Sequence, residues 1–247
     1  MIKTIMYLTK VLIASIIALF FASCKISYND YEGKIKGNGN VSTQNRTITS
    51  DFQKIEVGNG ILAIITQSKN QSITVETDEN LQEIIRTQIE DGVLKISAAS
   101  GYSASKSPKV SVHLPIISGL TASSGANLKS DNTLIVNDIA IKSSSGSEMT
   151  IQIEANDMSI SASSGSSATI SGKAQKLSTD TSSGSDLNCK KLMANQVVSE
   201  ASSGSTTKVT PIESLDAKAS SGAAIDYFNK PKTIFIKEGS GGSISAQ

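Results

Sequence analysis

Residues 144–166 read SSGSEMTIQIEANDMSISASSGS, and they contain one complete copy of the unit from which the second half of the chain is built. The glycine of this unit recurs at intervals of 18 to 21 residues. Its seven positions are Gly125, Gly146, Gly165, Gly184, Gly204, Gly222 and Gly241, and Ser-Ser precedes all but the last. Self-similarity at a period of this length is typical of a solenoid, in which each repeat forms one coil of a stack.

Apolar residues lie at fixed distances from these glycines. In the quoted unit, Met149 is the third residue after Gly146, Met158 is the seventh residue before Gly165, and both columns are mostly apolar in the other copies. Met158 and Ile160 alternate with polar residues, a period of two that is typical of a half-buried strand. Each coil is therefore expected to carry one strand after its glycine and a second strand before the next glycine.

These patterns predict an all-β fold: a single-stranded, right-handed parallel β-helix, or β-solenoid, with about 20 residues per coil. We expect the right-handed sense because crossovers between parallel strands nearly always have it. Repeat length varies only between the two strands of a coil, for example at 172–176 and 228–233. Variable stretches of a solenoid map to one edge, so the edge opposite the glycines is the expected place for a binding surface.

The whole chain divides into three parts. Residues 1–23 are expected to be a lipoprotein signal peptide, 24–36 a lipid-anchored tether, and 37–247 a β-solenoid domain. Within that domain, 37–117 reads as an irregular N-terminal β part with four strands, and 118–247 holds the Ser-Ser-Gly repeats. The segment from Asn80 to Ile89 is the one expected helix, because Asn80 can cap it and its apolar residues follow a helical spacing.

The N-terminal segment indicates export. Lys3 and Lys10 precede an apolar run from Val11 to Phe21, and small residues then lead to Cys24. This arrangement resembles a bacterial lipobox, which implies cleavage before Cys24, lipidation of its thiol and acylation of its amine. Such lipid would hold the protein on a membrane, with the outer membrane as the expected location, facing the cell surface or the periplasm. An ordinary secreted protein with a free Cys24 is the alternative.

The charge balance argues against nucleic acid as a partner. The chain has 23 basic and 22 acidic residues, and removal of the signal peptide takes away Lys3 and Lys10. The remaining lysines and acids are interspersed along the repeats, so neither a basic groove nor a long-range steering field is expected.

No metal, cofactor or catalytic site emerges from the sequence. His113 is the only histidine, and Cys189 falls in an apolar column and is expected to be a buried small hydrophobe. The Ser103-x-x-Lys106 pattern lacks the helix and the partner motifs of penicillin-recognising enzymes. The acids near the corners, Glu148, Asp186 and Asp226, stand at two different offsets, which does not fit a repeated calcium site.

The Ser-Ser-Gly ladder has two interpretations. Its hydroxyls can bond to one another and to the backbone of the turns, which makes the ladder structural. Alternatively, a flat array of hydroxyls can form a repetitive contact face for glycan hydroxyls or for ordered water. The chain has no Trp, 5 Tyr and 5 Phe, so it offers little to stack against sugar rings.

Several short motifs resemble one known family. They are Gly37-x-Gly39-Asn40-Val41, Arg46, Phe52-x-x-Ile55, Asp91-Gly92-x-Leu94-x-Ile96, Leu114-Pro115 and the repeated Ser-Gly-Ser. Over about residues 37 to 247 the chain is similar to the family of auto-transporter adhesins, head GIN domain, which is common among lipoproteins of Gram-negative bacteria. The resemblance implies a β-helical lipoprotein with an adhesive or surface role and without known catalytic residues.

The sequence therefore favours a non-enzymatic, lipid-anchored protein of the cell envelope that presents a solenoid surface in the manner of an adhesin. Its partners would be the membrane, through Cys24, and an unknown protein or glycan. A carbohydrate-active β-helix enzyme and a periplasm-facing lipoprotein that senses envelope stress are the alternatives. The last coil, Gly241 to Ser245, has no obvious polar cap, and an open end of this kind favours a homo-oligomer.

Overall fold

A computed structural model describes residues 34–247, of which Ile35–Gln247 form one compact unit. The expected signal peptide, the lipidation site Cys24 and most of the tether lie outside the described residues. Within 34–247 the regular structure consists of strands and one short 3-10 helix. No helix in this part of the chain combines the length and the apolar character needed to cross a membrane.

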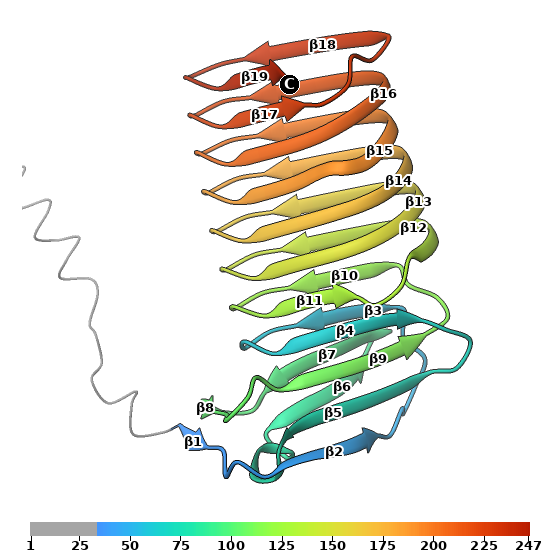
Figure 1. Cartoon of the computed structure of the whole chain (residues 1–247), viewed down its shortest axis with the longest axis vertical. Helices are drawn as coiled ribbons and strands as arrows, with labels where there is room; N and C mark the ends of the chain where they lie inside the picture. Colours follow the sequence, from blue (N-terminus) through green and yellow to red (C-terminus); the bar gives the residue numbers. More distant parts are fainter. Residues whose placement is uncertain (1–33) are drawn as a thin grey trace, which may run out of the picture. The chain divides into compact units, whose positions relative to one another are not determined.

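The predicted β-solenoid is confirmed (Figure 1). Its strands run parallel and in register, so that Met149 pairs with Leu128 on one side and with Ala168 on the other. The stack is built from β10 (Gly119–Ala122), β11 (Asn127–Ser130), β12 (Leu134–Ser143), β13 (Glu148–Ala162), β14 (Ser167–Thr181), β15 (Asp186–Ala201), β16 (Thr206–Ala219), β17 (Ala224–Tyr227), β18 (Thr233–Glu238) and β19 (Ser243–Ala246).

The coils enclose their core between two sheets. The leading sheet contains the residues that follow each glycine corner, as in β11, β17 and β19. The returning sheet contains the residues that come before the next corner, as in β10, β12 and β18. In Figure 1 the leading strands are nearer to the viewer and run away from the corners, while the returning strands run back behind them as the stack advances. The coil is therefore right-handed, as expected.

The two strands expected in each coil are merged in the middle of the stack. β13, β14 and β16 are continuous from one corner to the next, with 15, 15 and 14 residues. The backbone bends near Ala155, yet it keeps its partners there, because Glu154 pairs with Lys173 and Ala155 pairs with Ala174. Two separate strands per coil occur only at the ends, in β11 and β12 and in β17 and β18.

Each glycine corner is a two-residue turn with positive φ at both central residues. At the first corner φ is 51° for Ser124 and 70° for Gly125, and the amide of Ala126 donates to the carbonyl of Ser123 at 3.0 Å. This geometry is that of a type I′ turn, which requires the left-handed region twice in succession. The corners also bond to one another, since the amide of Gly125 donates to the carbonyl of Ser145 in the next coil at 3.0 Å.

Two more coils precede the repeats, and their order along the stack differs from their order in the sequence. β3 (Lys54–Val57) and β4 (Leu62–Gln67) are joined by a turn with positive φ at Asn59 and Gly60. They pair with β10 and β11 on one side. On their other side they pair with β7 (Val93–Ala98) and β9 (Lys109–Leu114), which come later in the chain.

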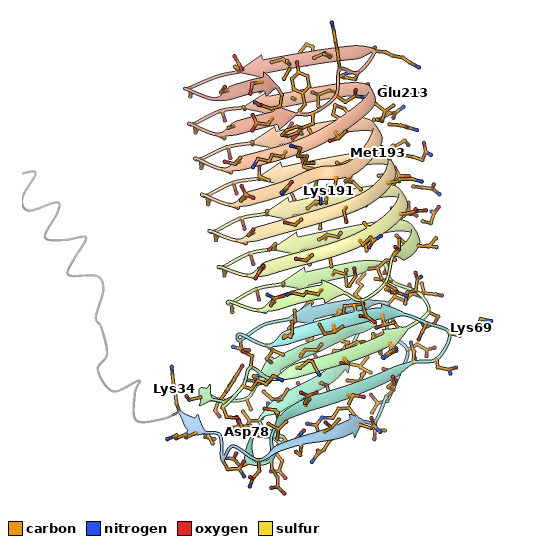
Figure 2. The ribbon with its side chains drawn as sticks, viewed as in Figure 1. Lys34, Lys69, Asp78, Lys191, Met193 and Glu213 are labelled. Atoms are coloured by element: carbon orange, nitrogen blue, oxygen red, sulfur yellow. The ribbon has the colours of Figure 1, made fainter. Side chains whose placement is uncertain are left out.

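Antiparallel strands close the N-terminal end of the stack. β5 (Ser72–Asp78) pairs with β9 and with β2 (Val41–Arg46), and β6 (Ile85–Glu90) pairs with β7. The short strands β1 (Ile35–Lys36) and β8 (Tyr102–Ser103) pair with each other beside them. Asp78, which Figure 2 labels at this end, accepts hydrogen bonds from the amide of Gly39 and from both the amide and the hydroxyl of Ser105. These bonds lower the pKa of its carboxyl group.

The helix expected from Asn80 to Ile89 is wrong. Only Glu79–Leu81 form a 3-10 helix, and β6 begins at Ile85. The apolar residues Leu81 and Ile84 close the end of the core in a turn, and buried Gln82 donates to the carbonyls of Ser42 and Val75. The apolar residues that suggested a helix are therefore buried in a turn and a strand instead. A segment of ten residues is too short for helix formation to outweigh this burial.

Aliphatic side chains fill the space between the sheets. Ile160, Ile141 and Leu120 lie one above the other in the returning sheet, each with at most 1% of its surface exposed. Burial of one such side chain contributes about 1.5 to 3 kcal/mol. A few polar groups share this core, and some of them pair with one another, since Thr179 Oγ1 donates to Ser199 Oγ at 2.8 Å.

Candidate functional site

The bend opposite the glycine corners carries two open grooves that run side by side across the same coils, β12 to β15. A ridge of amide side chains lies between them, formed by Asn137, Asn156, Gln175 and Asn195. The sheet groove, of about 630 Å³, lies on the outside of the returning sheet. The bend groove, of about 610 Å³, lies on the other side of the ridge. We refer to the three features together as the double groove.

The parallel register builds the amide ridge. Val136 pairs with Ala155 and Asp138 with Asp157, so Asn137 and Asn156 lie one above the other. Asn156 Nδ2 donates to Asn137 Oδ1 at 2.6 Å. Higher in the stack, Asn195 Nδ2 donates to Gln175 Oε1 at 2.6 Å. Each side-chain amide has more donors and acceptors than these bonds use, so the ridge offers hydrogen-bonding groups to a partner.

The sheet groove exists because its floor is made of small side chains. Ala140, Ser159 and Ser178 are register neighbours in three successive coils. The longer side chains of the adjacent columns stand beside them, among them Asp157 and Lys176, whose charged atoms are 3.7 Å apart. The groove thus combines hydroxyl groups and charges of both signs along its length.

The bend groove has apolar ends and a charged middle. Ile135, Glu154, Lys173 and Met193 form one column of register neighbours. Ile135 is 69% exposed and Met193 is 49% exposed, although both are apolar. Figure 2 labels Met193 on the bend side of the stack, with Glu213 on the same side further along. Exposed apolar side chains beside a groove are a common mark of an interaction site.

The double groove has the chemistry of binding. Its polar groups are amides, hydroxyls and single charges, and nothing in the region 34–247 brings three or more His, Cys, Asp or Glu side chains together as a metal site. One pair of carboxylates lies in it: Asp138 and Asp157 are register neighbours, about 4.8 Å apart along the stack. Asp138 accepts a hydrogen bond from Asn137 Nδ2 at 2.5 Å, and Asp157 faces Lys176.

The candidate residues from the sequence lie apart from the double groove. His113 is in β9, beside Thr66 and Ser72, and Ser103 is in β8. Cys189 is completely buried, as expected, and this burial raises the pKa of its thiol, so the thiolate needed for reactivity is suppressed.

The acids considered for calcium have other partners. Glu148 accepts a hydrogen bond from Asn127 Nδ2 at 2.7 Å, and Asp226 accepts one from Ser245 Oγ at 2.8 Å. Asp186 is a register neighbour of Ser167 and Thr206, so no second carboxylate flanks it in its column.

The serine ladder is structural in part. The serine after each corner glycine is buried where it occurs in the middle of the stack, and Ser166 Oγ donates to the carbonyl of Ser143 at 2.9 Å. The corner serines that precede the glycines, such as Ser164, are exposed. Within residues 34–247 no hydrogen bond joins the hydroxyls of these exposed serines to the protein. The bonds to the backbone of the turns come from the serines after the glycines, and Ser143 Oγ and Ser147 Oγ also bond to each other at 3.0 Å. The seven glycines all lie in these turns, with φ between 67° and 75°.

Sequence reasoning identified the edge but not the residues of the double groove. Aligning the repeats on their glycines places Ser159 and Ser178 in one column, and Asp157 and Lys176 in the next. That alignment was the available signal for a groove with a small-residue floor. The same alignment places Asn137, Asn156, Gln175 and Asn195 in one column, nine residues before the following glycine, so the amide ridge had a signal in the sequence as well.

Comparisons with known proteins agree with the fold. A putative adhesin from Bacteroides fragilis has 18% identity and a TM-score of 0.80, covering 86% of this chain and 100% of its own. A "putative lipid binding protein" from Parabacteroides distasonis has 20% identity and a TM-score of 0.69, with 87% and 99% covered. A putative adhesin from Parabacteroides merdae has 19% identity and a TM-score of 0.67, with the same coverage. No curated protein matches the chain.

A family model settles the wider relationship. The model described as "Putative auto-transporter adhesin, head GIN domain" matches residues 51–231, which is more than half of the chain and includes the two N-terminal coils, the repeats as far as residue 231 and the double groove. The resemblance expected from the short motifs is confirmed, and the chain belongs to the auto-transporter adhesin, head GIN domain family.

Proposed function

We propose that this protein is a non-enzymatic, adhesin-like binding protein of the cell envelope, and that the double groove holds an extended partner chain along the axis of the stack. The observation that carries the proposal is the pair of grooves, of about 630 and 610 Å³, on either side of one amide ridge. Their long direction follows the stacked coils, so successive units of a partner would meet successive coils about 4.8 Å apart.

The partner is a polypeptide or a glycan with many hydrogen-bonding groups. The ridge amides supply donors and acceptors, and Asp157 and Lys176 supply charges of both signs. None of the residues that line the two grooves is aromatic, so recognition of a sugar would depend on hydrogen bonds and not on stacking. Ile135 and Met193 add apolar contact at the two ends of the bend groove.

Blocking the sheet groove tests this function. The double substitution Ser159→Arg and Ser178→Arg places two long side chains on the groove floor, while Thr150→Arg and Thr169→Arg place the same side chains on the leading sheet of the same coils. We expect cells with the first variant to lose adhesion to surfaces coated with mucin, dextran or alginate, and cells with the second variant to keep it. Equal adhesion by the two variants to every surface would contradict the proposal.

We further propose that Cys24 carries the lipid anchor and places the protein at the outer membrane. The lipobox-like sequence before Cys24 supports the anchor, and the adhesin family to which the chain belongs supports a place in the cell envelope. Labelling of growing cells with an alkyne analogue of palmitate should mark the protein, and Cys24→Ser should remove the label. A labelled Cys24→Ser protein would contradict anchoring at this residue.

The side of the membrane is a separate question with a separate measurement. An adhesin must face the outside, whereas a sensor of envelope stress would face the periplasm. Added protease should remove the protein from intact cells if it faces outward, and only from permeabilised cells if it faces inward. Protection in intact cells would favour the stress-sensing alternative.

A carbohydrate-active enzyme is the alternative from a different class, and the Asp138 and Asp157 pair is the observation that favours it. Two carboxylates on either side of a glycosidic bond are the usual requirement for glycoside hydrolysis. Here each carboxylate already has a partner within the protein, because Asp138 accepts a hydrogen bond from Asn137 and Asp157 is close to Lys176. A hydrolysis screen that found turnover, lost in Asp157→Asn, would support the enzyme.

A further inference from the structure

The two ends of the solenoid are finished differently. At the N-terminal end the closing residues Leu81, Gln82 and Ile85 have 0%, 2% and 2% of their surfaces exposed. At the C-terminal end, Ile234 and Ile236 of β18 occupy the inward-facing column, but they are 37% and 40% exposed. Their register neighbours one coil below, Leu215 and Ala217, are 2% and 0% exposed. The last coil therefore leaves uncovered the aliphatic column that every earlier coil covers.

The two strands of this end also differ in their free edges. β18 pairs with β16, and no strand within residues 34–247 pairs with its outer edge. β19 pairs with β17, and on its outer edge the Glu238 carboxylate already accepts the amide of Ile244. The returning sheet thus ends in an open edge, whereas one amide at the edge of the leading sheet already has a hydrogen-bond partner. An open edge of this kind is a template for another strand.

The sequence of β18 is complementary to itself when reversed about Phe235. In an antiparallel pair centred on this residue, Lys232 lies opposite Glu238 of the second copy, and Ile234 lies opposite Ile236 of the second copy. The pair of Ile234 and Ile236 is on the inward-facing side, and the two-fold axis repeats both pairs. Lys232 lies just before β18, where its Nζ is 3.8 Å from Glu213 Oε1 of its own copy. Opposite charges and aliphatic pairs directly across from each other stabilise an antiparallel pair of strands.

We propose that β18 is a self-association edge, through which two copies of this chain join their returning sheets as antiparallel neighbours around a two-fold axis at Phe235. The pairing satisfies the open backbone groups of β18 and covers Ile234 and Ile236 with the same residues of the second copy. The closed N-terminal end offers no such column, so association stops at two copies and does not continue into a fibre.

A pair of cysteine variants tests the register. Phe235→Cys places the same residue on both strands directly opposite itself, with Cα atoms about 4.5 to 5.5 Å apart, within reach of a disulfide. Thr233→Cys is on the same face of β18, but it lies four residues from its own copy, about 13 Å away, beyond that reach. The full-length protein, with its lipid anchor, would be oxidised mildly in isolated membranes and followed on non-reducing gels.

We expect most of the Phe235→Cys protein to run as a dimer, and Thr233→Cys to remain at the level of the parent chain, whose described cysteine, Cys189, is buried. Equal cross-linking of the two variants would overturn the register. Cross-linking of Phe235→Cys to a different protein in preference to itself would overturn the choice of a second copy as the partner.

Charge reversal supplies an independent arm. Lys232→Glu should weaken the dimer of the detergent-purified full chain about tenfold in sedimentation, because it sets like charges opposite each other at two symmetric places. Adding Glu238→Lys should restore the dissociation constant to within about threefold, although that change alone also weakens the dimer. Lys230→Glu, which makes the same change in charge two residues further from β18, is the control and should have no effect. Failure of the double variant to recover would overturn the proposal.

Discussion

The two long edges of this solenoid follow different rules. At the glycine edge every turn has the same length and the same backbone angles, with φ of 48° to 54° at the serine and 67° to 75° at the glycine. At the bend edge the coils differ in length, side chains of several kinds are exposed, and the double groove is found. One edge therefore sets the spacing of the coils, and the other is free to vary in the chemistry that it presents.

The largest loss of stability is expected when Gly172, next to the bend, is replaced. Its φ is 127°, and a Cβ atom added there would overlap with the carbonyl oxygen of Ile153 in the neighbouring coil. Gly172→Ala should therefore cost about 3 to 5 kcal/mol, because the neighbouring backbone has to move. Urea unfolding followed by circular dichroism measures this loss. A change below about 1 kcal/mol would show that the bend tolerates such movement.

A corner glycine is expected to cost less when it is replaced. Gly165 has φ of 67°, but no atom lies within 4 Å of an added Cβ. The cost of Gly165→Ala is then only that of the left-handed conformation, about 1 to 2 kcal/mol. The same urea titration should rank it clearly below Gly172→Ala. If the two variants lose equal stability, the corner is more tightly packed than described.

The corner serines should be replaceable with a gain. Ser164 has φ of 54°, a conformation that asparagine adopts more readily than serine, and Asn-Gly is a preferred sequence for type I′ turns. Ser164→Asn should raise stability by about 0.3 to 1 kcal/mol. Differential scanning calorimetry would detect the rise in melting temperature, with Ser167→Asn on the leading sheet as a control that should bring no gain. A loss of stability in Ser164→Asn would refute the account of the corners.

The smallest effect on stability is expected on the amide ridge. Asn156→Ala removes one exposed hydrogen bond, from Asn156 Nδ2 to Asn137 Oδ1, so stability should fall by less than about 0.5 kcal/mol. If the ridge serves binding, the same variant should nevertheless reduce adhesion in the coated-surface assay. A large loss of stability without any loss of adhesion would reverse the roles assigned to the two edges.

The architecture could be predicted from the sequence because its signal is local. A turn with positive φ favours glycine, and stacked coils need apolar residues at fixed distances from that glycine. The spacing of Gly146 and Met149, repeated along the chain, therefore predicts the stacked coils. The N-terminal coils follow no such repeat. Nothing in the order of residues 54–114 indicates that β3 and β4 lie between β7 and β9 on one side and the repeats on the other.

The sequence predicted a helix that the structure does not contain, and it did not predict the double groove. The apolar spacing around Leu81 and Ile84 fits a helix and a buried turn equally, and only the pairing of β6 with β7 decides between them. The residues of the double groove keep constant offsets from the following glycine, but these offsets do not show where the backbone bends between the two sheets. The residues after each glycine are less regular, since β15 places extra residues between Asn188 and Met193 relative to β16.

The order of the first coils has a mechanical consequence. A force that pulls on the N-terminal side of the folded unit first loads β1, which pairs with β8, and then β2, which pairs with β5. The next coil, β3 and β4, is clasped from both sides, so withdrawing it means breaking two sets of parallel hydrogen bonds at once. The C-terminal coils, by contrast, can peel away singly. The fold is thus expected to resist tension better from its N-terminal side than from its C-terminal side.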